Sequence, residues 1–254
     1  MQQPSSGRLC CSLRKKVTLS ENIYPSLRTM GDKKGMKTVG FITIRLNSQR
    51  LPNKNILPLG EHPLSWYICN TLLHCSTIDE IYIYCSEARI MDYVPQDPRI
   101  IFQKRESWLD GDFIRAQDTY EAFVKEIDAD IYVAALTTAP FISAKSIDSA
   151  VSKVQSGEYD SSFAAKQIQT FAWYQGKPLN YSPEYIPRTQ DIEPVFVETS
   201  GFFAFRKDVW KGHKRRIGFH PYLQIVGDIE AIDIDTPQDY ELAEILVRGI
   251  WNGT

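Results

Sequence analysis

Residues 38–44, TVGFITI, and residues 45–56, RLNSQRLPNKNI, decide the fold of this chain. The first stretch is a short apolar run, which predicts a buried β-strand. The second carries Arg45, Arg50 and Lys54 among serine, asparagine and proline, residue types that form turns and expose backbone N–H groups. In α/β proteins, phosphate groups bind where a strand ends in such a loop. These cations therefore predict a phosphate site, with a solvated basic loop as the alternative.

Strand and helix patterns alternate along the residues that follow. Apolar runs and alternation predict strands over residues 78–86, 131–136, 161–165 and 201–205, and helical periodicity predicts helices over residues 63–73, 118–127 and 146–154 and from residue 237. This order predicts an α/β fold with a mostly parallel sheet and helices on both faces. Residues 166–200 are rich in aromatic residues and prolines, and we interpret them as an insertion for substrate binding or dimer contact.

The composition excludes several classes of function. The 254 residues suffice for one domain with a substantial core. Lysine plus arginine, 29, nearly equals aspartate plus glutamate, 31, so no overall charge indicates nucleic acid or an anionic membrane as a partner. No apolar run is long enough to span a membrane. The five cysteines have no zinc or redox spacing and favour a reducing compartment, so we predict a cytoplasmic protein.

The first 35 residues differ from the rest of the chain. They are basic up to Glu21 and lack the hydrophobic core of a secretory signal. We expect residues 1–35 to be a leader without ordered structure and residues 36–254 to form the domain. Met30 and Met36 are both plausible true starts.

Asp233 and Asp235 form an acidic pair near the end of the chain. If residues 231–235 are a strand, both carboxylates point to the same face. Two such carboxylates repel each other unless a cation lies between them, and Mg²⁺ suits carboxylates that share it with phosphate oxygens. The alternative is a strand end with two solvated acids before a helix capped at Thr236-Pro237.

The loop after the first strand resembles the signature loop of the sugar-acid cytidylyltransferases. Its pattern, R-x-x-S-x-R-L-P-x-K-N-I, is similar to that of the CMP-sialic acid synthetases and, more distantly, the CMP-Kdo synthetases. The resemblance implies a single Rossmann-like nucleotidyltransferase domain whose loop wraps the triphosphate of CTP. The nucleotide-binding residues implied in this loop are Arg45, Asn47, Ser48, Arg50, Lys54 and Asn55.

Further segments extend the resemblance over roughly residues 38–248. The segment I-D-I-D-T-P-x-D resembles the end of the family's domain and implies that Asp233 and Asp235 bind Mg²⁺. With Arg45 and Lys54 they form the implied catalytic set. Residues 104–112 resemble a segment beside the nucleotide, which implies nucleotide contacts for Arg105 and Asp112, although a surface turn explains these residues nearly as well.

The resemblance also implies a substrate side. Residues 187–190, PRTQ, match a family segment near the acid sugar, which implies sugar contacts for Arg188 and Gln190; the alternative is an Arg188 paired with Asp191 or Glu193. Some family positions differ. Val197 and Glu198 stand where some members place a second arginine, and Leu136 and Ile142 replace a glutamine and an arginine. These differences leave the identity of the sugar open.

We therefore expect a cytidylyltransferase, working as a homodimer, that couples CTP to a 2-keto sugar acid, a sialic-acid-like nonulosonate, and releases pyrophosphate. One alternative keeps the chemistry but changes the acceptor to Kdo or a phosphonate. The other is a nucleotide-binding protein without turnover.

Overall fold

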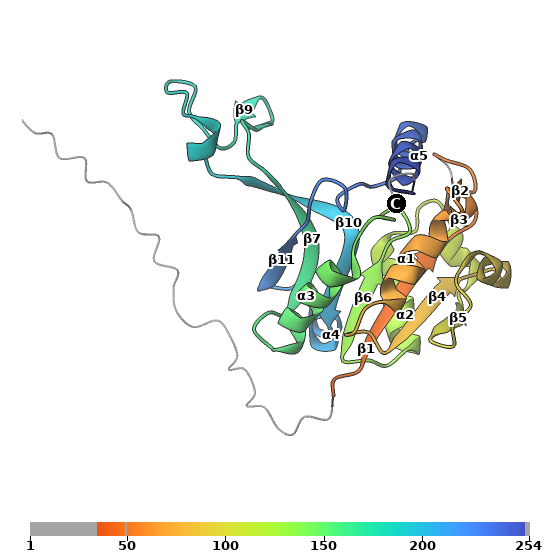
Figure 1. Ribbon diagram of the computed structural model, residues 1–254. Coiled ribbons are helices and arrows are strands. Elements are labelled where there is room, and N and C mark those ends of the chain that lie inside the picture. The colour runs from red at the N-terminus through yellow and green to blue at the C-terminus, as the bar shows by residue number, and fades with distance from the viewer. Residues whose placement is uncertain (1–34, 49, 252–254) are drawn as a thin grey trace, which may run out of the picture. The chain divides into compact units, whose positions relative to one another are not determined.

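A seven-stranded sheet forms the centre of the domain in the computed structural model, which describes residues 35–48 and 50–251 (Figure 1). The strands lie in the order β11 (Pro221–Ile225), β7 (Ser161–Ile168), β10 (Val195–Arg206), β6 (Ile131–Ala135), β1 (Thr38–Ile44), β4 (Glu80–Cys85) and β5 (Ile100–Lys104). All neighbours pair in parallel except β10, which is antiparallel to both β6 and β7. The predicted mostly parallel sheet is confirmed. The predicted leader lies outside the described residues, apart from Gly35.

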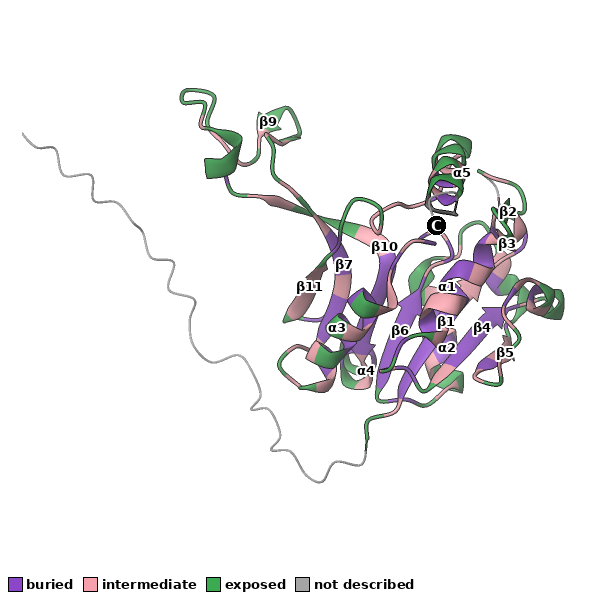
Figure 2. Cartoon of the chain, viewed as in Figure 1, coloured by how far each residue is buried: buried purple, intermediate pink, exposed green. Residues whose placement is uncertain are grey.

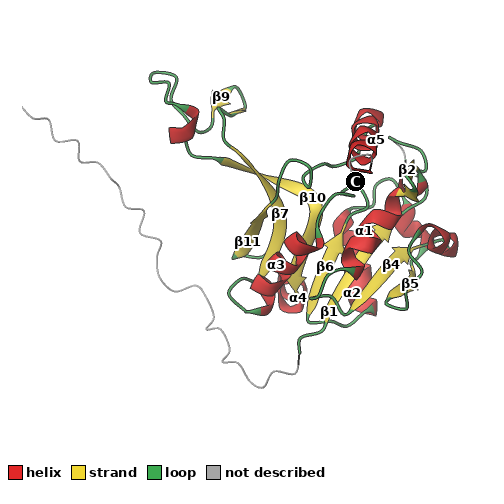
Figure 3. Cartoon of the chain, viewed as in Figure 1, coloured by secondary structure: helices red, strands yellow, loops and turns green. Residues whose placement is uncertain are grey.

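Helices cover both faces of this sheet, as predicted (Figure 3). Helices α1 (Leu64–Leu73) and α3 (Ala144–Gln155) pack on one face, and α2 (Ala116–Glu126) and α4 (Lys207–His213) on the other. Strand β1 shows why its sequence is apolar without interruption. Phe41 packs toward α2 and Ile42 packs toward α1 and α3, and both are fully buried. A strand covered on two faces has no polar side to show in its sequence.

A smaller cluster joins the last helix to the carboxyl edge of the sheet. Helix α5 (Pro237–Trp251) packs against α1 and the short hairpin of β2 (Pro58–Leu59) and β3 (His62–Pro63). The buried members of this cluster are Leu59, Leu64, Tyr67, Ile234, Ala243 and Val247. This packing holds the segment before α5 over the carboxyl ends of the parallel strands. No helix of the described residues is long and apolar enough to cross a membrane.

The inserted segment extends away from the sheet between β7 and β10 (Figure 1). It contains the two-residue strands β8 (Trp173–Tyr174) and β9 (Lys177–Pro178) and the 3₁₀ turn η4 (Thr189–Asp191). Most of its residues are exposed (Figure 2). The insertion predicted at residues 166–200 is therefore present, although β7 includes its first residues and β10 its last ones.

Residues 231–235 do not form the strand on which the expected shared face of Asp233 and Asp235 depended. These residues pair with no strand, and Ile234 N donates a single bond of 2.8 Å to Thr138 O. Their apolar alternation has another cause, because Ile234 is fully buried in the α5 cluster while its neighbours are half-exposed. Among the α-helices and the strands of the central sheet, β5, β11 and α4 were not predicted. The two strands lie at the edges of the sheet, and α4 has only seven residues, so their sequence signals are weak.

Candidate nucleotide and metal site

The site lies where the strand order reverses, between β1 and β6. One neighbour of β1 leads on to β4 and β5 and the other to β10 and β7, so the connections leave in opposite directions from the carboxyl ends. The predicted phosphate loop follows β1 and ends in the 3₁₀ turn η1 (Lys54–Ile56). Asn55 fixes it, since its Nδ2 donates to Arg45 O at 2.7 Å and its Oδ1 accepts from Thr137 Oγ1 at 2.5 Å. This buried amide thereby ties the loop after β1 to the loop after β6.

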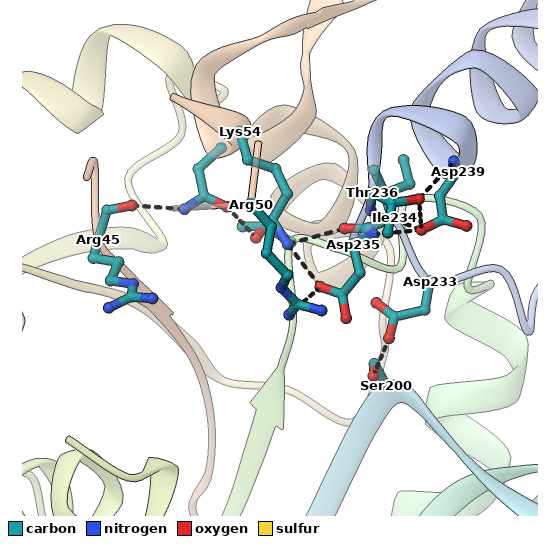
Figure 4. A network of polar contacts seen from close by, with 11 residues as sticks. Arg45, Arg50, Lys54, Ser200, Asp233, Ile234, Asp235, Thr236 and Asp239 are labelled. Carbon is teal, nitrogen blue, oxygen red and sulfur yellow. Dashed lines mark hydrogen bonds and ion pairs between the residues drawn. The ribbon is translucent and has the colours of Figure 1, made fainter. Parts of the chain in front are cut away.

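Two predicted loop cations meet one carboxylate. Lys54 Nζ lies 3.0 Å from Asp235 Oδ1 and also donates to Ile234 O at 2.9 Å. Arg50 Nη2 lies 2.9 Å from the same Asp235 oxygen. Figure 4 shows both cations pointing toward Asp235, with Asp233 beside it. The Lys54 side chain is 13 % exposed whereas that of Arg50 is 68 % exposed, so Lys54 is the fixed member and Arg50 the accessible one.

Asp233 has a different environment. Its Oδ2 accepts from Ser200 Oγ of β10 at 2.7 Å, and its Oδ1 is buried with no hydrogen-bond partner among the described residues. A buried carboxylate oxygen without a donor is costly unless a cation or water satisfies it. This oxygen is therefore the part of the site most in need of a ligand.

The start of α5 sets the position of Asp235. Asp239 Oδ2 accepts from Asp235 N at 3.0 Å, Thr236 N at 2.7 Å and Thr236 Oγ1 at 2.8 Å, and Asp239 N donates back to Thr236 Oγ1 at 3.3 Å. This is the reciprocal arrangement of a capping box. The hydrogen bond from the Thr236 hydroxyl is the main cause that lowers the pKa of Asp239. The helix cap that the sequence indicated at Thr236-Pro237 is confirmed, and Asp239 is the acid in the first turn of α5.

The donors present fit Mg²⁺. The described residues contain no group of three or more histidine, cysteine, aspartate or glutamate side chains able to hold a metal. Mg²⁺ does not need such a group, because it binds through one or two carboxylates and takes its other ligands from water and substrate phosphates. Asp233 offers an unpartnered buried oxygen, and Asp235 lies beside two cations that would face a phosphate chain.

The remaining predicted nucleotide contacts, Arg45, Arg105 and Asp112, differ in their surroundings. Arg45 Nη1 lies 3.6 Å from Asp112 Oδ1, which brings the loop and residues 104–112 together as predicted. Arg105 is 3 % exposed; its Nη2 donates to Ile44 O at 2.9 Å and pairs with Asp110. Its guanidinium therefore braces the end of β1 in this structure. The contact of Arg105 with a nucleotide stays a prediction.

Of the other predicted residues, Asn47 and Ser48 lie in the loop itself, and Arg188 and Gln190 lie in the insertion. Asn47 is exposed and Ser48 half-buried. Arg188 belongs to the insertion and pairs at two points with Asp191, at 2.8 and 3.0 Å, which is the alternative that the sequence left open. Gln190 is exposed in the same turn. Within one chain the insertion extends away from the sheet and from α5 (Figure 1), so the sugar contacts of Arg188 and Gln190 stay predictions.

Two residues of the site were not singled out from the sequence. Ser200 positions Asp233, and Thr137 positions Asn55. Each is a small hydroxyl residue in a stretch that resembles the family, residues 197–203 and 136–142; Thr137 follows the end of β6, whereas Ser200 lies within β10. That signal is too common in loops to have identified them without the geometry.

Comparisons with known proteins identify the family of the chain. The family model described as cytidylyltransferase matches residues 39–246. Two pseudaminic acid cytidylyltransferases of Campylobacter jejuni subsp. jejuni, from serotype O:23/36 (strain 81-176) and serotype O:2 (strain ATCC 700819 / NCTC 11168), are 24 % and 23 % identical to the chain over 229 residues. Each alignment covers 84 % of this chain and 97 % of the relative.

A solved structure of CMP:2-keto-3-deoxy-manno-octonic acid synthetase complexed with CTP superposes with a TM-score of 0.63 at 17 % identity. The superposition covers 84 % of this chain and 99 % of that one, and at this identity it establishes the fold. The family match spans most of the chain and includes the loop after β1 and both aspartates. The chain therefore belongs to the cytidylyltransferase family, a family of nucleotidyltransferases, as its signature loop predicted.

Proposed function

We propose that this protein couples CTP to a 2-keto sugar acid of the sialic-acid-like nonulosonate class and releases pyrophosphate. The observation that carries the proposal is that Lys54 and Arg50 both form ion pairs with Asp235. Asp233, with its unpartnered buried oxygen, lies beside them (Figure 4). It is supported by relatives named for pseudaminic acid and by a neighbour named for a 2-keto-3-deoxy sugar acid.

In the proposed reaction, the anomeric hydroxyl of the sugar acid attacks the α-phosphorus of CTP. A bond forms from this oxygen to phosphorus, the bond to the bridging oxygen of pyrophosphate breaks, and the hydroxyl proton passes to solvent water. Arg45, Arg50 and Lys54 would neutralise the triphosphate and the leaving pyrophosphate, which is where negative charge increases. Bound Mg²⁺, held by Asp233 and Asp235, would supply a Lewis acid for the phosphate oxygens.

We also propose that the protein works as a homodimer through its insertion. The insertion exposes several large apolar side chains, among them Trp173, Tyr174, Leu179, Tyr185 and Ile186, each more than half exposed. A contiguous segment with so many exposed apolar residues favours contact with another protein surface. Because the insertion extends away from its own site, we place Arg188 and Gln190 toward the site of the second copy.

The test of the activity is release of pyrophosphate with Mg²⁺ present. Four nucleoside triphosphates are crossed with sialic, pseudaminic, legionaminic and 3-deoxy-manno-octulosonic acids. Release with CTP and a nonulosonate supports the proposal. Release with only the octulosonic acid would change the acceptor class, and CTP binding without release from any acceptor would support a protein without turnover.

The metal assignment predicts the effect of Asp235→Asn. The variant keeps an oxygen for Lys54 but loses the charge, so we expect turnover to fall by about 100-fold or more while the melting temperature changes little. Asp228→Asn is the matched control, since Asp228 is 86 % exposed and pairs only with Lys166 among the described residues. Full activity of Asp235→Asn would contradict the assignment.

A further inference from the structure

Arg216 is a partly buried cation that the proposed chemistry does not yet use. It follows α4, and its guanidinium carbon lies 3.6 Å from the centroid of the Phe203 ring on β10. Its Nη2 contacts Glu198 Oε1 at 2.6 Å. On the other side lies Tyr120 of α2; burial raises the pKa of Tyr120, and the positive charge of Arg216 opposes this rise. Arg216 is therefore held by an aromatic face, one carboxylate and one helix.

A wide bulge in β10 brings Glu198 and Phe203 together under this guanidinium. The pairing of β10 with β7 jumps from Glu198 opposite Ala165 to Phe203 opposite Phe163, so residues 199–202 stand against Ala164 alone. Bulges of this kind redirect side chains and are frequent beside active sites. Here the bulge carries Ser200, whose hydroxyl donates to Asp233.

Arg216 is linked to the acidic pair through β10. Glu198 contacts Arg216, and Ser200, two residues further along the chain in the bulge, contacts Asp233. In a 2-keto sugar acid the carboxylate is attached to the same carbon as the attacking hydroxyl. Its binding group must therefore lie within a few ångströms of the reacting phosphate, on the sheet side of Asp233.

We propose that Arg216 binds the carboxylate of the sugar acid, an inference that rests on the proposed function. The ion pair with Glu198 engages one guanidinium nitrogen, and a guanidinium carries five N–H donors, which leaves donors for a second carboxylate. Stacking on Phe203 fixes the plane of the group and lowers the entropy lost on binding. Glu198 is 41 % exposed at its side chain, so the pair with Arg216 is weak enough for a substrate carboxylate to compete.

The assignment also accounts for a difference from the family. Residues 197 and 198, where some members have an arginine, are Val197 and Glu198 here. Glu198 instead holds an arginine from a different part of the chain at the same end of β10. A cation thus lies beside residue 198, although it is supplied by Arg216 and not by residue 197 or 198 itself.

The experiment compares pseudaminic acid with its methyl ester as acceptors, with CTP and Mg²⁺. In Arg216→Gln we expect the KM for the acid to rise about 10- to 100-fold, because a charged hydrogen-bond pair with the substrate is lost. The KM values for the ester and for CTP should stay within about 2-fold of wild type. Glu198→Gln removes a competing negative charge, and its KM for the acid should fall by about 2- to 5-fold. The Glu198 variant keeps the test decisive if Arg216→Gln does not fold.

The matched control is Arg215→Gln. Arg215 is adjacent and exposed, and it stacks on Phe219, 4.8 Å from its ring centroid; its KM for the acid should not change. Equal losses for acid and ester in Arg216→Gln would indicate a structural clamp and overturn the inference. So would loss of the acid-to-ester preference in Arg188→Gln but not in Arg216→Gln. If the wild type releases no pyrophosphate with any acid, the proposed function fails and this inference fails with it.

Discussion

At the scale of single residues, neighbours of the same type have different surroundings. Asp233 and Asp235 alternate in sequence, yet one is held by Ser200 and the other by two cations. The sequence predicted each of these charges from its own motif. It could not join them, because Lys54 and Asp235 are 181 positions apart and meet only through the packing of α5 on α1.

The capping box of α5 gives a pH-dependent prediction. The pKa of Asp239 is lowered chiefly by the hydrogen bond from Thr236. A carboxyl group with a lowered folded-state pKa stabilises the fold above its unfolded pKa, near ~3.9, and this contribution is lost as the pH falls through the folded pKa. We expect Asp239→Asn to lose about 1 kcal/mol of unfolding free energy at pH 7, the usual effect of losing a cap.

Urea unfolding between pH 7 and pH 3 checks this expectation. The difference between wild type and Asp239→Asn should shrink as the pH drops below about 4 toward the lowered folded pKa of Asp239, since the carboxylate charge is progressively lost over this range. Asp228→Asn, an exposed acid outside any cap, should behave like wild type. A difference that is constant with pH would mean that the carboxylate charge of Asp239 does not contribute.

At the scale of elements, hydrophobic periodicity predicted the long buried helices and strands. It failed where tertiary contacts, and not the local sequence, determine the conformation of a segment. The helices at residues 63–73 and 146–154 appear as α1 and α3, within one or two residues at each end. Residues 231–235 show the opposite case. Their alternation is that of a strand, but the segment crosses the edge of the sheet and is held by α5.

Substitution of Gly60 tests the packing of the β2–β3 hairpin against α5, which holds residues 231–235 in place. Gly60 forms the β2–β3 turn with φ +63°, and a Cβ there would lie 2.5 Å from Val247 Cγ1 of α5. Gly60→Ala should therefore cost about 2–4 kcal/mol, the sum of backbone strain and overpacking. Gly157 has φ +78° with nothing within 4 Å of the Cβ that alanine would add, so Gly157→Ala isolates the strain and should cost about 1–2 kcal/mol. Equal losses of unfolding free energy in the two variants would show that the turn does not pack against α5.

At the scale of the whole molecule, the class of fold was predictable and the order of the strands was not. Alternating strands and helices imply a parallel sheet because each helix returns the chain to the same edge. No local pattern specifies that β10 inserts antiparallel between β6 and β7, since this follows from the long insertion that reverses the chain. One side of the candidate site is formed at that junction, where Ser200 of β10 contacts Asp233.

The insertion provides the prediction that belongs to this scale. Tyr185 and Ile186 are 76 % and 71 % exposed, and a face of this kind in water favours association. If the homodimer forms through it, Tyr185→Ser with Ile186→Ser should shift the mass measured by light scattering from twice that of the chain toward that of one chain. The melting temperature of the domain should change little, because neither side chain packs in the described core. Ile245→Ser on α5, 66 % exposed, is the matched control and should leave the mass unchanged. A double variant with an unaltered dimer mass would place the interface elsewhere, and Arg188 and Gln190 would then lose their route to the second site.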